Sequence, residues 1–349
     1  MIHEVGKIES FMEWTGKPVL VTGGASFIGS HLVDALVDRG AVVTVADDLS
    51  SGRLENIQPH LDAGRVKFLN ADLRRQSEAE AATLGQEQVF HLAADHGGRG
   101  YIETHEAACA GNLMLDGIVF NACIKCGVDR IVYASSGCVY PKNLQADPDK
   151  IINLSEEHVG PPYDADGIYG WAKLMGEKTL TAHAREHGLQ AVNCRYFTVY
   201  GPRATENHAV IAMIARAFVK QDPFEVWGTG EQIRNWTYVS DIVEGTLMAA
   251  EYAPAGDAVN IGTMEGTRVM DAVKQILARS GHDASIVTRP DMPTGPYYRI
   301  ADNSRLAKLS GWTPKVTFAD GLQRTMDWYF STKSLADIRS QLPELLLER

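Results

Sequence analysis

Short runs of β-branched and apolar residues alternate with longer amphipathic stretches between residues 17 and 200. The first run, Val19–Val21, ends at glycines, and a helix is predicted to follow. In that stretch Leu32 and Leu36 recur at helical spacing, and Gly40 marks the helix end. Five further runs predict strands at Val42–Val45, Val66–Leu69, Val89–Leu92, Ile131–Ala134 and Ala191–Arg195. Strands that alternate with helices in this way predict a parallel sheet covered by helices on both faces.

The alternation weakens after about residue 200, where segments rich in Gly, Pro and Trp replace it. The predicted fold is therefore α/β, with a doubly wound parallel sheet followed by a smaller C-terminal α/β lobe. The predicted parts are an N-terminal arm (1–16), a sheet domain (17–200) to which 235–262 partly return, and the lobe (201–234 and 263–349).

The turn after the first strand has the residues of a dinucleotide site. Gly23 permits a tight turn, and Gly29 lets the following helix pack closely on the sheet. Ser26 stands where such turns usually have their middle glycine, and we expect its hydroxyl to donate to a phosphate oxygen. Phe27 and Ile28 open the helix, whose free N–H groups and dipole favour a pyrophosphate. The pattern is that of a Rossmann-type fold.

The ends of the next strands supply further cofactor contacts. Asp47 follows the second strand at about the distance at which an acidic residue binds the adenosine ribose. A carboxylate there accepts from the 2′-hydroxyl and repels a 2′-phosphate, which favours NAD over NADP, although Arg53 lies nearby. We also expect the cofactor to contact Asp72, Leu73, Leu92, Ala93 and Ala94.

Composition narrows the class of protein. The 349 residues carry a net charge of −11, which disfavours a nucleic-acid partner. No apolar run has the length of a membrane span, so we expect no membrane partner and a cytoplasmic location. Five cysteines without small-scaffold spacing suggest reduced thiols, and the CxxC of Cys123 and Cys126 lies in an apolar predicted helix. We therefore predict no metal site.

Tyr169 and Lys173 form the most specific chemical signal. They lie four residues apart at the start of a predicted helix, so both project from one face. A neighbouring ammonium group favours the phenolate, which can accept a hydroxyl proton while hydride leaves for NAD. Ser136 follows the strand Ile131–Ala134 and is expected to orient the same substrate hydroxyl.

Together, the glycine turn, Asp47, Ser136, Tyr169 and Lys173 resemble an extended short-chain dehydrogenase/reductase of the nucleotide-sugar epimerase/dehydratase group. The resemblance covers about Val19 to Tyr329 and includes two characteristic motifs, Arg195–Pro202 and Arg234–Asp241. It implies bound NAD, a nucleotide-diphosphate sugar as substrate, and a homodimer formed through helices near 112–126 and 169–187.

Within this family, Ala93–Ile102 and Tyr133–Pro141 are most similar to motifs of the GDP-mannose 3,5-epimerases. That resemblance implies an acid/base role for Cys138 and sugar contacts for Gly98 and Arg99. The lysine that partners the cysteine in those enzymes has no clear counterpart, and His208 is the proton donor at about that place.

The chemistry of a 4-ketosugar explains how a cysteine at position 138 could act as an acid/base group. Oxidation of C4 to a ketone acidifies the hydrogens on C3 and C5, and a thiol can exchange them. Dehydratases of the group carry glutamate at Cys138 and aspartate at Gly137, so dehydration is disfavoured. The alternatives are a UDP-sugar 4-epimerase of the UDP-glucose or UDP-glucuronate type without Cys138 chemistry, a dehydratase, or a non-catalytic NAD-binding regulator. In these alternatives Cys138 has no chemical role and only lines the wall of the pocket.

Two arginines of the predicted lobe suit the diphosphate of a GDP- or UDP-sugar. Arg234 and Arg299 carry guanidinium groups that bind phosphate oxygens in pairs, and the resemblance implies one in each half of the lobe. A surface salt bridge is the alternative for each. Thr198 stands where many members of the group have an asparagine that touches the sugar.

Overall fold

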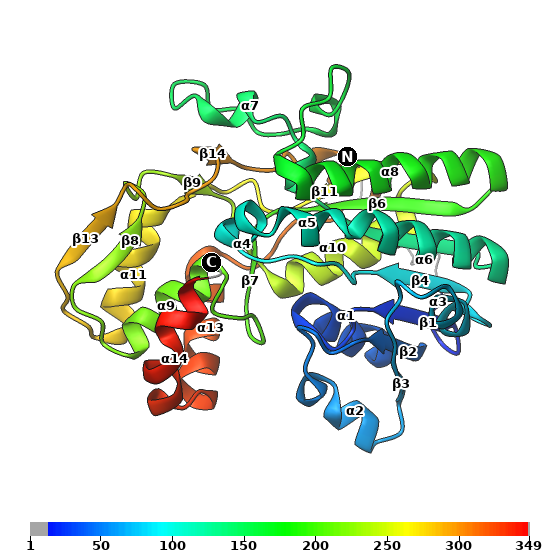
Figure 1. The fold of residues 1–349 in the computed structure, drawn as a ribbon, viewed down its shortest axis with the longest axis horizontal. Helices are drawn as coiled ribbons and strands as arrows, with labels where there is room; N and C mark the ends of the chain where they lie inside the picture. The colour runs from blue at the N-terminus through cyan, green and yellow to red at the C-terminus, as the bar shows by residue number, and fades with distance from the viewer. Residues whose placement is uncertain (1–12, 348–349) are drawn as a thin grey trace, which may run out of the picture.

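A seven-stranded parallel sheet forms the centre of the computed structural model, which describes residues 13–347 (Figure 1). Its strands, in spatial order, are β3 (Val66–Asn70), β2 (Val42–Asp47), β1 (Pro18–Thr22), β4 (Gln88–His91), β5 (Arg130–Ser136), β6 (Gln190–Tyr196) and β11 (Ala258–Ile261). Neighbouring strands are all parallel; Val21, for example, is in register with Val45 and Phe90. The predicted doubly wound sheet is confirmed, and each predicted strand lies within two residues of its observed ends.

Helices cover both faces of the sheet. On one face α1 (Phe27–Asp38) packs against α10 (Val239–Tyr252), and on the other α6 (Asn112–Cys126) packs between α3 (Gln76–Thr83) and α8 (Gly167–His187). Shorter helices lie in the connections: α2 (Gln58–Asp62), α4 (Arg99–Thr104), α5 (Glu106–Ala110), α7 (Asn143–Ala146) and α12 (Ser304–Ser310), with 3-10 turns at Leu54–Asn56, Gly137–Val139 and Glu156–His158.

A second group of elements lies at the left of Figure 1 and has its own apolar core. Its helices are α9 (Ala209–Phe218), α11 (Val269–Ser280), α13 (Phe318–Thr332) and α14 (Leu335–Leu347). Its short strands are β7 (Val199–Tyr200) with β10 (Thr237–Tyr238), β8 (Phe224–Trp227) with β13 (Ile286–Arg289), and β9 (Ile233–Arg234) between β12 (Thr267–Arg268) and β14 (Tyr298–Arg299). Helix α10 and strand β11 return to the large sheet.

Residues 1–12 of the predicted arm lie outside the described residues. Of the remainder, Trp14 is buried, and its ring lies 6.0 Å from that of Phe90 on β4. The first helix ends at Asp38, and Gly40 turns the chain with a positive φ of 81°. This turn brings the chain back into β2.

The stretch Glu106–Cys126 is long and apolar enough to cross a membrane by length and composition. In the fold it comprises α5 and α6, and its Val119 and Phe120 belong to the core beneath the sheet. Cys123 and Cys126 are free thiols, and burial raises the pKa of Cys123 to about 12. These properties are those of a core helix.

Candidate active site

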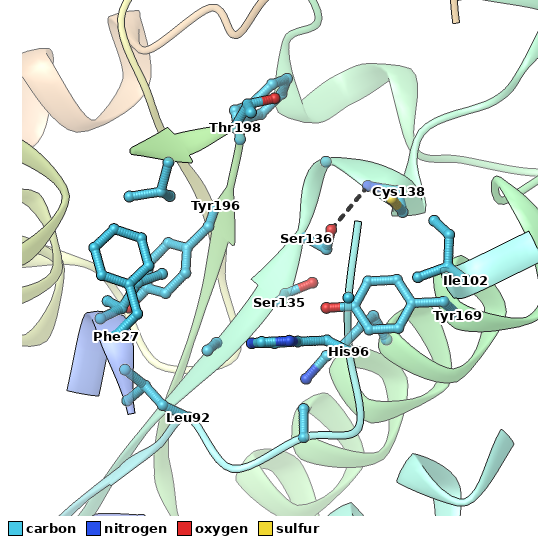
Figure 2. A pocket seen from close by; sticks show the side chains of 18 of the residues that line it. Phe27, Leu92, His96, Ile102, Ser135, Ser136, Cys138, Tyr169, Tyr196 and Thr198 are labelled. Atoms are coloured by element: carbon cyan, nitrogen blue, oxygen red, sulfur yellow. Dashed lines mark hydrogen bonds between the residues drawn. The ribbon is translucent and has the colours of Figure 1, made fainter. Parts of the chain in front are cut away.

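Three side chains with the expected chemistry meet where β5 ends and α8 begins. Ser136 is the last residue of β5, and Tyr169 and Lys173 lie on the first turns of α8. Figure 2 shows the hydroxyl groups of Ser136 and Tyr169 facing the same part of the pocket. The Lys173 Nζ lies 6.0 Å from the Tyr169 ring centroid. The four-residue spacing therefore produces the predicted shared face.

Buried ionic contacts hold α8 against the sheet. Glu177, one turn after Lys173, accepts two hydrogen bonds from the Arg195 guanidinium of β6, at 2.9 and 2.8 Å, and a third from the Ser135 hydroxyl. Both charged side chains are 5% exposed, so neither can rotate away without leaving a buried charge unpaired. This anchor fixes the position of Tyr169 relative to Ser136.

Burial shifts the pKa values of both Tyr169 and Lys173. It raises the pKa of the Tyr169 phenol well above its usual range, while a hydrogen bond with the Ser136 side chain acts in the opposite direction. Burial also lowers the pKa of the Lys173 ammonium, because a charged form loses hydration in the pocket. Formation of the phenolate therefore depends on positive charge kept close to Tyr169.

A groove runs from Asp47 to Tyr169 along the carboxyl edge of the sheet. It consists of two adjoining hollows of about 1080 and 1060 Å³. The two share the residues Ser26, Leu92, Ala94 and His96. The predicted residues Gly23, Asp72, Leu73 and Ala93 line the first hollow, and Phe27, Ile28 and Gly29 line the second. The groove thus joins the predicted adenosine end to the predicted nicotinamide end.

The glycine turn leaves no room for larger residues. A Cβ on Gly29 would lie 2.1 Å from the Gly23 carbonyl oxygen, and one on Gly23 would lie 2.9 Å from the Ala93 nitrogen. Gly23 also has a positive φ of 67°. Among the described residues no side chain caps the N-terminus of α1, so its first N–H groups remain available to an anion.

Ser26 differs from the prediction in one respect. Its hydroxyl donates to the Gly23 carbonyl oxygen at 2.6 Å and so closes the turn, rather than pointing its proton at a phosphate. Donation to a phosphate oxygen would require this hydroxyl to rotate away from Gly23, and it stays a prediction. Ser26 still lines the groove.

Asp47 is positioned to accept further hydrogen bonds. Its two oxygens accept from the backbone nitrogens of Ala25 and Leu49 at 3.0 and 2.9 Å, and burial raises its pKa. Each carboxylate oxygen has a second lone pair for a ribose hydroxyl. The residues present thus fit a dinucleotide with a free 2′-hydroxyl.

Asp47→Asn is expected to weaken NAD binding by about ten- to a hundredfold, because hydrogen bonds to a charged acceptor contribute about 1.5–3 kcal/mol. Discrimination against NADP should fall as well, since the charge that repels a 2′-phosphate is gone. Titration calorimetry with both nucleotides measures this. Asp62→Asn is the matched control, because the exposed Asp62 carboxylate accepts from Gln58 on α2 and does not line the groove. Unchanged selectivity in Asp47→Asn would contradict the assignment.

Cys138 lies where the catalytic pocket meets a third hollow of about 1020 Å³. The 3-10 turn Gly137–Val139 buries its side chain to 7% exposure, and its N–H donates to Ser136 Oγ at 3.1 Å. Arg299 Nη1 donates to Cys138 Sγ at 3.3 Å. The Cys138 sulfur thus lies between the pocket of Tyr169 and a guanidinium group.

Three arginines surround the third hollow. Arg234 and Arg299 are in register on β9 and β14, and Arg99 opens α4 opposite them. Burial lowers the pKa of Arg234 to about 9, and repulsion from the other two adds to this. Its guanidinium donates to the carbonyl oxygens of Ile233 and Thr294 at 2.8 and 2.7 Å. Concentrated positive charge of this kind favours a diphosphate.

Asp166, the N-cap of α8, holds two of these arginines. Its Oδ2 accepts from Arg99 and Arg299 at 2.7 Å each, and its side chain is 1% exposed. Burial alone would raise the pKa of Asp166, but the guanidinium groups of Arg299 and Arg99 outweigh burial and lower it to about 2. Asp166 therefore couples the predicted diphosphate site to the helix that carries Tyr169.

Asp166→Asn should lower the free energy of unfolding at pH 7 by about 2 kcal/mol, because a pKa lowered from 3.8 to about 2 stabilises the folded state. The depressed pKa makes this stabilisation present above pH 3.8 and lost as the pH falls through about 2. Urea denaturation of both proteins at pH 7 and pH 3 tests this. The difference between them should be about half as large at pH 3. A difference independent of pH would contradict it.

His208 and His96 face each other across the pocket, with ring centroids 6.1 Å apart. Burial, with a smaller contribution from His96, lowers the pKa of His208, the N-cap of α9, to about 4. Burial by the surrounding pocket also lowers the pKa of His96. In Figure 2 the His96 ring lies between Leu92 and Tyr169. His208 therefore reaches the site as predicted in position, but as a neutral imidazole at pH 7.

Several site residues carried weak sequence signals. His96 lies in a glycine-dense loop that resembles an ordinary turn, and Asp166 precedes the helix without a motif. Gly98 and Thr198 border the third hollow as expected. That hollow is also lined by residues that had no sequence signal, among them Asn207, Trp227 and Gln232.

The parallel sheet, glycine turn and Ser136, Tyr169 and Lys173 define the class of protein as an NAD-dependent short-chain dehydrogenase/reductase. Residues 19–262 match the model of the NAD dependent epimerase/dehydratase family, and the chain belongs to that family. It is 30% identical over 316 residues to GDP-mannose 3,5-epimerase 1 of Oryza sativa subsp. japonica, covering 89% of this chain and 81% of the relative. The family and cofactor predictions are confirmed.

Solved structures of nucleotide-sugar epimerases have the same fold as this chain. The structure of UDP-glucose 4-epimerase from Thermotoga maritima with UDP-glucose superposes with a TM-score of 0.81 at 31% identity, covering 90% of this chain and 99% of that one. UDP-glucuronic acid 4-epimerase from Bacillus cereus, in complex with UDP-glucuronic acid and NAD, gives a TM-score of 0.81 at 28% identity, with 90% and 99% coverage. The relatives thus include both 3,5-epimerases and 4-epimerases.

Proposed function

We propose that this protein is a nucleotide-sugar epimerase that acts through a transient 4-ketosugar, with Cys138 as an acid/base group, as in a GDP-mannose 3,5-epimerase. The observation that carries the proposal is the position of Cys138 Sγ. It lines the pocket of Tyr169 and lies 3.3 Å from the Arg299 guanidinium. A thiol in that place serves proton exchange on the sugar.

The first step is oxidation at C4. Once cofactor and sugar are bound, the Lys173 ammonium stabilises the phenolate form of Tyr169, which accepts the proton of the C4 hydroxyl while Ser136 orients that hydroxyl. When bound along the groove from Asp47 to Tyr169, NAD would supply the hydride acceptor for this oxidation. Arg99, Arg234 and Arg299 bind the diphosphate and exclude water from it. The net result is epimerisation without consumption of cofactor.

Proton exchange follows at the carbons next to the ketone. The Cys138 thiolate accepts a proton from C3 or C5, the electron pair delocalises into the C4 carbonyl, and a proton is returned to the opposite face of the same carbon. His208 lines the same pocket and is the candidate donor of that proton. Return of the hydride and of the Tyr169 proton then restores the C4 hydroxyl.

A UDP-sugar 4-epimerase is the second candidate function. It is favoured by the neutral state of His208, whose pKa of about 4 makes it a weak proton donor at pH 7. A 4-epimerase needs only Tyr169, Lys173 and Ser136, because rotation of the ketosugar replaces proton exchange at C3 or C5. A dehydratase is less consistent with a cysteine at Cys138, and a regulator without turnover has no need of the three polar groups.

We further propose a homodimer in the cytoplasm. Leu113 and Met114 of α6 and Trp171 and Met175 of α8 are exposed apolar side chains on neighbouring helices. Apolar side chains gathered on adjacent helices are typical of an interface between subunits. Sedimentation of the purified protein measures the oligomeric state directly.

Incubation in deuterated water separates the two epimerase candidates. The purified protein is mixed with GDP-mannose, UDP-glucose or UDP-glucuronate, and the recovered sugars are analysed by proton NMR. We expect deuterium at C3 or C5 of the GDP-linked sugar. A changed C4 configuration without deuterium on the carbon skeleton would favour the 4-epimerase, and turnover of no nucleotide sugar would favour the regulator.

A further inference from the structure

A line of buried polar side chains lies beneath Lys173. Thr22 at the end of β1, His91 at the end of β4, Asp116 on α6 and Tyr133 on β5 are each at most 2% exposed. Thr22 Oγ1 lies 2.7 Å from His91 Nδ1, and His91 Nε2 lies 3.1 Å from Asp116 Oδ1. The Tyr133 hydroxyl donates to Asp116 Oδ2. The proposed mechanism uses none of these four groups.

The hydrogen bonds of Thr22 decide the tautomer of His91. Thr22 Oγ1 accepts from the backbone nitrogens of Leu92 and Ala93 at 3.1 Å each, which uses both of its lone pairs. Its own proton is then left for His91 Nδ1, which assigns the imidazole proton to Nε2. That proton is donated to Asp116.

Asp116 consequently accepts from two donors, His91 and Tyr133. With the imidazole proton on Nε2 alone, neither donor is a cation. A carboxylate this deeply buried is stable only when a cation lies close to it. Lys173, which is 1% exposed, is a buried cation close to Tyr133, and in the described part of the chain it is not paired with another carboxylate, whereas Arg195 is paired with Glu177.

The Tyr133 ring lies between the two charges. Lys173 Nζ is 4.6 Å from the centroid of that ring, and the hydroxyl of the same ring bonds to Asp116. A phenol that donates to a carboxylate gains electron density in its ring, and a cation over the ring face is attracted to that density. The ring therefore transmits the charge of Asp116 to Lys173.

Other groups around Lys173 do not supply this charge. The α8 neighbours are Tyr169, whose phenol is neutral at rest, and Glu177, which is neutralised by Arg195. The loop after β4 contributes His96, which is neutral at pH 7. Among the described residues, the helix α5 and the turn after β5 place only cysteines, Cys109 and Cys138, near Tyr169. Asp116 alone opposes the effect of burial on the pKa of Lys173.

We propose that Asp116, acting through the Tyr133 ring, is the counter-charge that keeps Lys173 in its ammonium form beside Tyr169. Asp116 and Tyr133 are thus positioning residues rather than catalytic ones, since neither lines the pocket. The effect on Lys173 stands by itself; its consequence for turnover rests on the proposed function.

The titration of Lys173 tests this without a substrate. The full-length protein is prepared with lysine labelled with ¹³C at Cε, and its chemical shift is followed against pH. The Lys173 signal is identified by its loss in Lys173→Arg. We expect Asp116→Asn to lower the titration midpoint of Lys173 by about one pH unit or more, because a buried cation then lacks its counter-charge. Tyr133→Phe keeps the ring and should shift the midpoint in the same direction by less.

Two comparisons make the result decisive. Glu186→Gln removes an equal charge from the exposed far end of α8 and should leave the Lys173 midpoint unchanged. Circular dichroism shows which variants fold, and if Asp116→Asn does not fold, Tyr133→Phe decides alone. An unchanged or raised midpoint in the folded variants overturns the inference.

Turnover gives the second readout. If the protein is an epimerase, the pH at which activity falls on the alkaline side should move down in Asp116→Asn by the same interval as the Lys173 midpoint. A shifted midpoint with no turnover of any nucleotide sugar by the wild-type protein would leave the inference intact and reject the proposed function. Turnover by the wild-type protein together with an unshifted Lys173 midpoint in Asp116→Asn would support the proposed function and reject the inference.

Discussion

Tyr169→Phe should lower turnover of the nucleotide sugar by about 100- to 10,000-fold, the usual contribution of a positioned proton acceptor. Phenylalanine keeps the ring that packs at the start of α8 and removes only the hydroxyl that faces Ser136. The C4 hydroxyl then has no group to take its proton, so the ketone cannot form. Bound NAD should be retained, because the groove from Asp47 to the glycine turn is untouched.

Product formation and the nucleotide that remains with the purified protein are measured side by side. Tyr163→Phe is the matched control, since Tyr163 is exposed and its ring lies under Lys178, 4.6 Å from its amine. Tyr169→Phe with more than a tenth of wild-type turnover would show that another group accepts the proton.

Cys138→Ala should abolish the incorporation of solvent deuterium at C3 and C5, with a loss of about 100-fold or more in the rate of exchange. Oxidation at C4 should persist, because Tyr169, Lys173 and Ser136 are unchanged. The variant would then separate two steps that the wild-type protein couples. Proton NMR of the sugar recovered from deuterated water measures the exchange.

The control for this variant is Cys126→Ala, which removes a thiol from the far end of α6. It should exchange deuterium at the wild-type rate. If Cys138→Ala also exchanges at that rate, Cys138 is a wall residue and the 3,5-type chemistry is wrong, whereas the C4 oxidation is unaffected by that outcome.

Local signals were sufficient for the main sheet. In continuous apolar runs such as Val19–Val21 and Ile131–Ala134, the side chains on both faces of the strand are apolar. Such runs therefore predict strands that are buried on both faces. Parallel pairing then places the strand ends, and with them Asp47 and Ser136, at one edge. The i,i+4 spacing of Tyr169 and Lys173 depends only on helix geometry and was predictable for the same reason.

Contacts between distant segments were not predictable. Arg299 meets Cys138 across 161 positions of the chain, and the sequence gives no measure of how the C-terminal lobe closes on the sheet. The direction of the Ser26 hydroxyl depends on a rotamer choice within the turn. The burial of Trp14 was also missed, because its contact with Phe90 joins the chain terminus to a central strand.

The polar line beneath Lys173 had no sequence signal. Asp116 lies in an apolar helix, where a single carboxylate resembles a surface residue, and Tyr133 reads as part of a buried strand. Only the packing of α6 and α8 over β5 brings both beneath the amine.

In the proposed reaction, a sugar hydroxyl beside Tyr169 is oxidised by a nicotinamide that stays bound. Rapid mixing of the purified, NAD-loaded protein with GDP-mannose, UDP-glucose or UDP-glucuronate, followed at 340 nm, tests it most directly. With the true substrate we predict a rise in absorbance that decays as product forms, and no rise in Tyr169→Phe. A flat trace from the wild-type protein with a nucleotide sugar that it binds and converts would contradict the account.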